Sequence, residues 1–237
     1  MWKRVQRAWR RHGPRKFAGL VIYNIRYFAT RWMRAGALVD TADREFDEFF
    51  GTDTSDIHEV GSLDVPSSNV RHAVRYQPTD TGLFRRIMQG LDIEFNGYEF
   101  IDFGSGKGRV LLLASDYPFR RITGVEFSPE LQRIAQRNIA IYRNPARNCQ
   151  DVTSVCCDAT EFCIPVKPLV CFFYNPFGAD VMRKVVSNIE DSLRTESRDA
   201  YVVYVDPVHK DVFESSGLWH VLRADNQHIL YRGVPGG

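Results

Sequence analysis

The segment Glu99–Ser115, EFIDFGSGKGRVLLLAS, contains the pattern that decides the fold. A short apolar run is followed at once by three glycines at alternate positions, and then by a second apolar run rich in leucine. This order predicts a strand, a tight turn and a helix. Glycines let the backbone turn sharply and approach a ligand without clashes from a Cβ atom. The segment therefore predicts an α/β unit with a ligand-binding turn.

The same alternation continues along the chain from residue 76 onward. Ser128-Pro129 predicts the start of one of its helices, with serine as the N-cap and proline in the first turn. A closing hairpin over 219–223 and 228–231 would add one reversed strand. We therefore expect an α/β fold of three layers, with a mostly parallel seven-stranded sheet and one antiparallel strand. The other strands are expected over 98–103, 121–126, 152–157, 169–174 and 200–205.

Three kinds of glycine-rich turn compete for residues 102–108. A phosphate-binding P-loop needs Gly-Lys followed by Ser or Thr, but here Lys107 is followed by Gly108. A dinucleotide turn needs a third glycine where this chain has Arg109. What remains is the pattern Asp-x-Gly-x-Gly-x-Gly. This pattern suits a ligand with a bulky body and a cationic centre, which Asp102 could attract.

Acidic and amide side chains also follow the later strands. Glu126 ends the second strand, 22 residues after Gly104, where a carboxylate can accept hydrogen bonds from both hydroxyls of a ribose. Asp158 follows the third strand, and Asn175 follows the fourth. Ligands of such sheets bind beyond the carboxyl ends of the strands. We therefore expect these side chains to gather around one site.

Four segments together resemble the motifs of class I S-adenosylmethionine-dependent methyltransferases, in the usual order and at the usual spacing. The resemblance covers about residues 76–231 and is closest to uncharacterised bacterial methyltransferases with a YNPF motif. It implies a Rossmann-like methyltransferase fold, a catalytic domain over 76–237 and S-adenosyl-L-methionine as the cofactor. The four segments are EFIDFGSGKGRVLLLAS, ITGVEFSPELQRIAQRNI, CCDA and CFFYNPF.

The resemblance also implies a set of cofactor-binding residues. In the family's pattern the glycine turn contacts the methionine moiety, Glu126 the ribose and Asp158 the adenine. Tyr76 and Thr79, in RYQPTDTGL before the first helix, could bind the methionine carboxylate, although Tyr76 could instead be a core aromatic. The full expected set is Tyr76, Thr79, Asp102, Gly104, Ser105, Gly106, Gly108, Glu126, Phe127, Asp158, Ala159 and Asn175.

Asn175, Pro176 and Phe177 are the expected catalytic residues. They resemble the Asn-Pro-Pro-Phe motif of methyltransferases that act on planar or amide nitrogens, in which the asparagine holds the NH group and the aromatic ring stacks on it. Here the second proline is missing, so a plain strand-end turn with Phe177 over the cofactor stays open. We expect methylation of a nitrogen in a protein or small molecule. The alternative is a non-catalytic partner subunit that binds S-adenosylmethionine.

Residues 1–36 are expected to form a basic amphipathic helical arm. They contain ten Lys or Arg and no Asp or Glu, which leaves 21 basic and 29 acidic residues for the rest of the chain. The resulting net charge of −8 makes a nucleic-acid partner less expected. The arm could pack on its own domain, mediate self-association or bind an anionic membrane surface. Residues 37–75 are expected to be a connecting or lid segment.

The five cysteines indicate a reducing compartment. Their number is odd, and none forms a Cys-x-x-Cys pair or has a histidine at zinc spacing, so we expect no metal. The sequence lacks the roughly 18–20 consecutive apolar residues of a membrane span. We therefore expect a cytoplasmic protein, with peripheral attachment to a membrane through the arm as an option.

Overall fold

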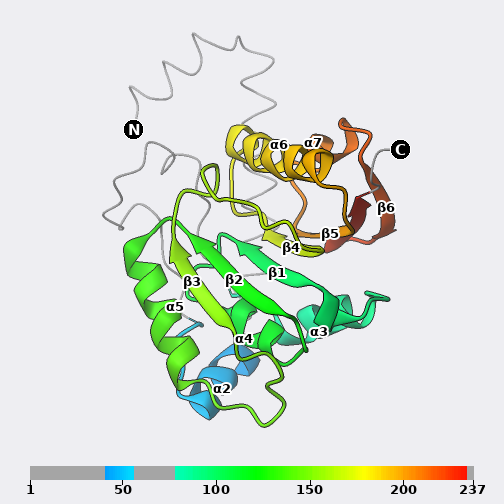
Figure 1. Ribbon diagram of the computed structural model, residues 1–237. Helices are drawn as coiled ribbons and strands as arrows, with labels where there is room; N and C mark the ends of the chain where they lie inside the picture. The colour runs from blue at the N-terminus through cyan, green and yellow to red at the C-terminus, as the bar shows by residue number, and fades with distance from the viewer. Residues whose placement is uncertain (1–40, 56–77, 234–237) are drawn as a thin grey trace, which may run out of the picture. The chain divides into compact units, whose positions relative to one another are not determined.

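The computed structural model describes residues 41–55 and 78–233 (Figure 1). The expected arm over 1–36 and Tyr76 lie outside the described residues. The chain divides into two compact units, Met1–Arg44 and Glu45–Gly237. The fold and the candidate site belong to the second unit. Among the described residues, no helix has the length and hydropathy needed to cross a membrane.

Strands and helices alternate through most of this unit, as the sequence predicts. The strands are β1 Glu99–Phe103, β2 Arg121–Glu126, β3 Val152–Cys156, β4 Leu169–Tyr174, β5 Ala200–Val205, β6 Trp219–Ala224 and β7 His228–Gly233. The helices are α2 Thr41–Phe50, α3 Thr81–Gln89, α4 Arg109–Ser115, α5 Pro129–Ile141, α6 Ala179–Thr195 and α7 Asp211–Glu214, with a 3-10 turn at Phe95–Gly97.

The seven strands form one sheet in the order β3-β2-β1-β4-β5-β7-β6. The pairs from β3 to β5 are all parallel, whereas β7 runs antiparallel to both β5 and β6. The predicted sheet of seven strands with one reversed strand is therefore confirmed. The order also shows that β1 lies at the centre of the sheet, with β2 on one side and β4 on the other.

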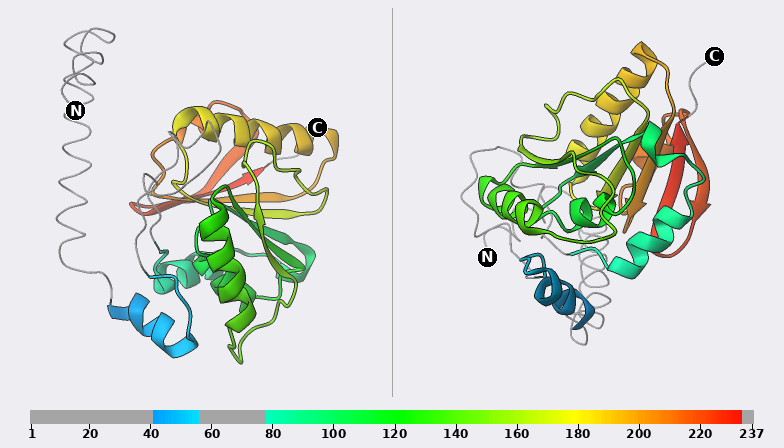
Figure 2. Two further views of the ribbon diagram at one scale, coloured as in Figure 1. Left: turned by 90° about the vertical axis from the view of Figure 1, so that its left-hand side faces the viewer. Right: turned by 60° about the horizontal axis from the view of Figure 1, so that its bottom comes forward.

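Helices cover both faces of the sheet (Figure 1). Alternate residues of β1 enter two separate cores: Phe100 packs with α3 and α4, and Phe103 packs with α6. The left view of Figure 2 likewise shows α6 and α5 on opposite sides of the sheet. Because both faces are covered, every residue of β1 and β5 is buried. This explains why these strands read as nearly continuous apolar runs.

Local signals define the helix starts. Ser128 Oγ accepts a hydrogen bond from Leu131 N at 3.3 Å and caps α5, as predicted. Asp80 Oδ1 accepts from Leu83 N at 2.6 Å and caps α3. Helix α2 was not predicted, because its position within 37–75 lacks sustained periodicity. Its aromatic residues instead make tertiary contacts, such as that between Phe50 and Tyr142 at 4.7 Å between ring centroids.

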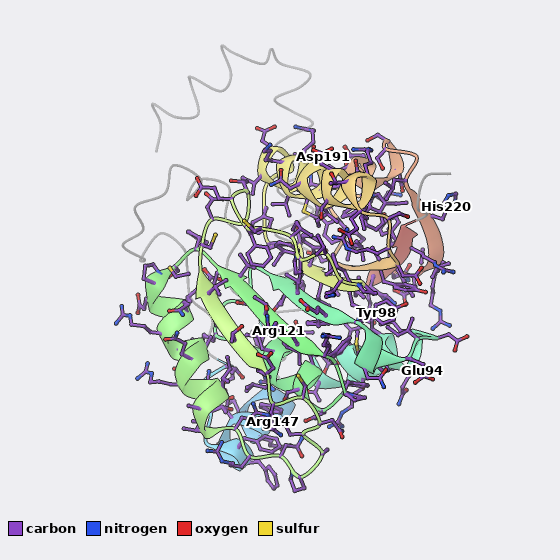
Figure 3. The ribbon with its side chains drawn as sticks, in the orientation of Figure 1. Glu94, Tyr98, Arg121, Arg147, Asp191 and His220 are labelled. Atoms are coloured by element: carbon purple, nitrogen blue, oxygen red, sulfur yellow. The ribbon has the colours of Figure 1, made fainter. Side chains whose placement is uncertain are left out.

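The outer strand β6 is exposed and irregular. Only Trp219, its first residue, is buried, and its indole Nε1 donates a hydrogen bond to Glu190 of α6 at 2.9 Å. The pairing with β7 shifts register between Val221 and Arg223, which marks a bulge. Figure 3 labels His220 on this strand, at the edge of the sheet.

Candidate functional site

The glycine turn and Asn175 follow the two central strands of the sheet at the same edge. The chain runs from β1 outward to β2 and β3, and then returns to β4 on the other side of β1. Phe103, the last residue of β1, is in register with Phe173 of β4. This reversal of strand order is the point where open α/β sheets bind ligands. The structure therefore brings together the turn after β1 and the segment after β4.

The glycine turn has a backbone that other residues adopt only at a cost. Gly104, Gly106 and Gly108 have φ values of 79°, 53° and 85°. A Cβ atom at position 104 would lie 2.5 Å from Pro176 Cβ. The glycine turn and the Asn-Pro-Phe segment thus touch at a point where no side chain fits between them.

Glu126 holds the glycine turn from the end of β2. Its carboxylate is buried, and it accepts hydrogen bonds from Gly106 N at 2.8 Å through Oε2 and from Ser128 N at 2.9 Å through Oε1. Burial raises the pKa of Glu126 to about 7, although these backbone hydrogen bonds oppose the rise. The backbone N–H of Phe127 also lowers this pKa as a hydrogen-bond donor, and because a carboxylate has about four lone-pair sites, the group can still accept a hydrogen bond from a ligand.

Asp102 is a second buried carboxyl group at this site. Burial raises its pKa well above the ordinary value, and the charge of nearby Glu126 raises it further. Because a nearby positive charge favours the ionised form of a buried carboxyl group, this pair suits a ligand that brings positive charge. The attraction of a cationic centre by Asp102 stays a prediction.

Of the remaining predicted cofactor residues, Ser105 lies in the glycine turn and three residues follow β2 and β3, whereas Thr79 precedes α3. Asp158 Oδ1 accepts hydrogen bonds from Thr160 N at 2.9 Å and Thr160 Oγ1 at 2.7 Å, which fixes the loop after β3. Thr79 is buried just before α3. Ser105 Oγ is buried with no hydrogen-bond partner among the described residues. Phe127 is half-buried and Ala159 is buried at the ends of β2 and β3.

Asn175 and Phe177 differ in their surroundings. Asn175 is buried and has a positive φ of 39°. Phe177 packs in the core beneath α6, with 7% of its surface exposed. This position favours a packing role for the ring, and its contact with a methyl acceptor stays a prediction. The described residues contain no group of His, Cys, Asp or Glu that could hold a metal ion.

Lys107 makes a contact that sequence reasoning missed. Its side chain is 1% exposed and pairs with Asp53, a residue 54 positions earlier, at 2.5 Å. Asn138 of α5 joins the same cluster, because its Nδ2 donates to Lys107 O and Asp53 O, each at 2.9 Å. Lys107, the lysine that makes the turn resemble a P-loop, therefore forms an ion pair with Asp53 of the same chain.

Arg109, the residue that replaces the third glycine of a dinucleotide turn, is also buried by the segment before the domain. Its guanidinium lies 4.1 Å from the ring centroid of Phe46 in α2. The loop after α2 is fixed by Asp47, whose carboxylate accepts four hydrogen bonds from Thr52, Thr54 and Ser55. The cluster of Thr, Asp and Ser over 52–55 was the available signal for this loop.

Comparisons with known proteins give structural likenesses only. No family model matches the chain, and no curated protein matches it. The sheet order and the helices on both faces define a Rossmann-like α/β domain.

Several solved structures resemble this domain. An RNA methyltransferase from Salinibacter ruber in complex with S-adenosyl-L-homocysteine is 20% identical, covers 67% of this chain and 93% of its own, and has a TM-score of 0.44. A putative methyltransferase from Escherichia coli is 18% identical over 72% of this chain and 90% of its own, with a TM-score of 0.49. The glycopeptide N-methyltransferase MtfA, complexed with S-adenosylmethionine, is 10% identical over 67% and 95%, with a TM-score of 0.48.

Proposed function

We propose that this chain is an S-adenosylmethionine-dependent methyltransferase that acts on a nitrogen of a protein or small molecule. One observation carries the proposal: the left-handed glycine turn, two buried carboxyl groups and Asn175-Pro176 meet at the switch point of the sheet. When bound, this cofactor supplies an activated sulfonium methyl group. The protein then has to align the donor with the acceptor and exclude water.

The residues around the turn fit this cofactor in charge and in shape. Glu126 has acceptor capacity left for a ribose hydroxyl, and the buried Asp102 carboxyl group would be favoured in its charged form by an ammonium group placed beside it. The absence of a Cβ at Gly104 keeps the turn close to Pro176.

The finer assignments belong to the same proposal. We place the chain with the class I enzymes that carry a YNPF motif, with three layers and the methyltransferase domain over 76–237. Asn175 and Pro176 would bind the acceptor, and Asp158 with Phe127 and Ala159 would contact the adenine. The cytoplasm is the proposed location, with the arm free to serve self-association or membrane attachment.

Calorimetry with S-adenosylhomocysteine tests the cofactor half of the proposal. The full-length protein should bind this product analogue, and Glu126→Ala should weaken binding by about 1–3 kcal/mol because a charged acceptor is lost. Glu130→Ala, an exposed carboxylate in the first turn of α5, is the matched control and should change little. No binding to the wild-type protein at millimolar ligand would overturn the proposal.

Transfer of a labelled methyl group tests the acceptor half. Cell extract separated into protein, RNA and metabolite pools should accept label in the protein or metabolite pool. Label found in RNA alone would contradict the proposed acceptor class. A chain that binds the analogue and labels no pool would instead support the non-catalytic partner subunit.

A further inference from the structure

Two strained residues stand side by side next to the proposed acceptor site. Of the described residues, Asn175 and Asp206 are the two non-glycine residues with a positive φ, at 39° and 49°. They directly follow Tyr174 and Val205, the last residues paired between the parallel strands β4 and β5. Such a backbone costs about 1–3 kcal/mol per residue and is concentrated at functional sites. The backbone strain therefore indicates that the ends of β4 and β5 belong to a functional site.

Asp206 fixes which way the Asn175 carboxamide points. Asn175 Nδ2 donates a hydrogen bond to Asp206 Oδ2 at 3.3 Å. A carboxylate only accepts hydrogen bonds, so the NH₂ end of the amide must face Asp206 and the oxygen must face away. Asp206 is itself held by its backbone, because its N donates to Gln227 O at 2.9 Å.

In this orientation the amide oxygen of Asn175 has no hydrogen-bond donor among the described residues. Asn175 is 5% exposed, and its Oδ1 is buried without a hydrogen-bond partner among the described residues. A buried carbonyl oxygen without a partner is destabilising by about 1–3 kcal/mol, so its presence calls for an explanation. A ligand that donates a hydrogen bond would remove this cost.

We infer that Asp206 is a positioning residue that sets the acceptor specificity of the site, by turning Asn175 Oδ1 toward an acceptor that carries an N–H group. This inference rests on the proposed function and narrows its acceptor class. An amino or amide nitrogen can donate to Oδ1, as a neutral hydroxyl also can, whereas a carboxylate or phenolate presents only lone pairs and is disfavoured beside this oxygen. A nitrogen that gains positive charge on alkylation is favoured by the same carboxylate.

The experiment uses the full-length protein saturated with S-adenosylhomocysteine. Nuclear magnetic resonance follows the side-chain NH₂ group of Asn175. These resonances are assigned because they disappear in the Asn175→Ala variant. In the wild-type protein, acetamide should shift these resonances and acetate, which has a similar shape, should not. Asp206→Ala should speed solvent exchange of the NH₂ group and reduce the preference for acetamide by roughly tenfold, since one oriented hydrogen bond is lost. Asp206→Glu should restore part of the preference.

Methyl transfer provides the second measurement. Asp206→Ala should lower kcat by about 10²-fold because the acceptor is misplaced, with the Kd for S-adenosylhomocysteine within threefold of wild type. The matched control is Asp211→Ala, an exposed carboxylate at the start of α7, which should change neither quantity. If Asp206→Ala behaves like Asp211→Ala in both the resonance experiment and methyl transfer, the inference fails while the proposed function stands. If the wild-type protein does not bind S-adenosylhomocysteine, the proposed function itself fails.

Discussion

Replacing Gly104 with alanine probes the contact between the glycine turn and the Asn-Pro-Phe segment. The left-handed backbone at φ 79° disfavours alanine by about 1–2 kcal/mol. The new Cβ would lie 2.5 Å from Pro176 Cβ, whereas carbon atoms pack best at about 3.5–4.0 Å, so one segment must move by about 1 Å. Overpacking of this kind adds about 1–3 kcal/mol. The free energy of unfolding should therefore fall by about 2–5 kcal/mol.

Gly217→Ala separates the backbone penalty from the clash. Gly217 has φ 69°, and a Cβ there would meet nothing within 4 Å, so only the cost of about 1–2 kcal/mol is expected. Denaturant titrations of both variants give the difference. Pro176→Gly should be less destabilising in the Gly104→Ala background than in the wild-type protein by about 1–3 kcal/mol, because it removes the opposing Cβ. The affinity of Gly104→Ala for S-adenosylhomocysteine should fall at least about tenfold. Equal losses in Gly104→Ala and Gly217→Ala, with unchanged affinity, would refute the reasoning.

Three further perturbations test the surroundings of the turn. Asp53→Asn should lower the free energy of unfolding by about 1–3 kcal/mol, because Lys107 is left buried without its counter-charge. The control Asp151→Asn breaks the exposed pair with Arg121 (Figure 3) and should lower the free energy of unfolding by under about 1 kcal/mol. Similar losses in the two variants would contradict the role given to Asp53. The pKa of Glu126, about 7 against an ordinary 4.5, means that the folded state binds more protons between these values, so stability should fall as pH rises through this interval. In urea titrations, Glu126→Gln should reduce the dependence of the free energy of unfolding on pH. The affinity of the wild-type protein for S-adenosylhomocysteine should decrease below pH about 7, as the carboxylate becomes protonated. A pH-independent affinity would argue against ribose binding by Glu126. Phe177→Ala should lower the free energy of unfolding by about 3–5 kcal/mol. Phe177→Leu should fold and catalyse methyl transfer at the normal rate if the ring only packs in the core. Slow turnover in a stable Phe177→Leu variant would place the ring at the acceptor.

Sequence reasoning succeeds where the signal is local. The bounds of β2, β4 and β5 follow from apolar runs and the start of α5 follows from Ser128-Pro129, and all are observed as expected. The places of Asp102 and Glu126 at the carboxyl ends of β1 and β2 follow from the same apolar runs. These features depend on neighbours in sequence and on the general rule that parallel strands present their carboxyl ends together.

Features that depend on distant partners were not predictable in the same way. Helix α2 is fixed by contacts of Phe46 and Phe50 with residues far along the chain, so its own pattern carries little information. Lys107 reads as an exposed loop residue until Asp53 is placed beside it. Positive φ values at Asn175 and Asp206 likewise depend on the packing of two strands, and the residue types are only a weak signal, because Asn and Asp adopt such values more often than other non-glycine residues.

The irregular strand β6 has a consequence for self-association. An edge strand presents backbone donors and acceptors on which another chain can add a strand, and exposed Val221 and Leu222 would favour such growth. The bulge between Val221 and Arg223 interrupts the regular spacing of these groups. An incoming strand would find matching partners over only a few residues, so the bulge protects this edge from intermolecular sheet extension and from aggregation during folding.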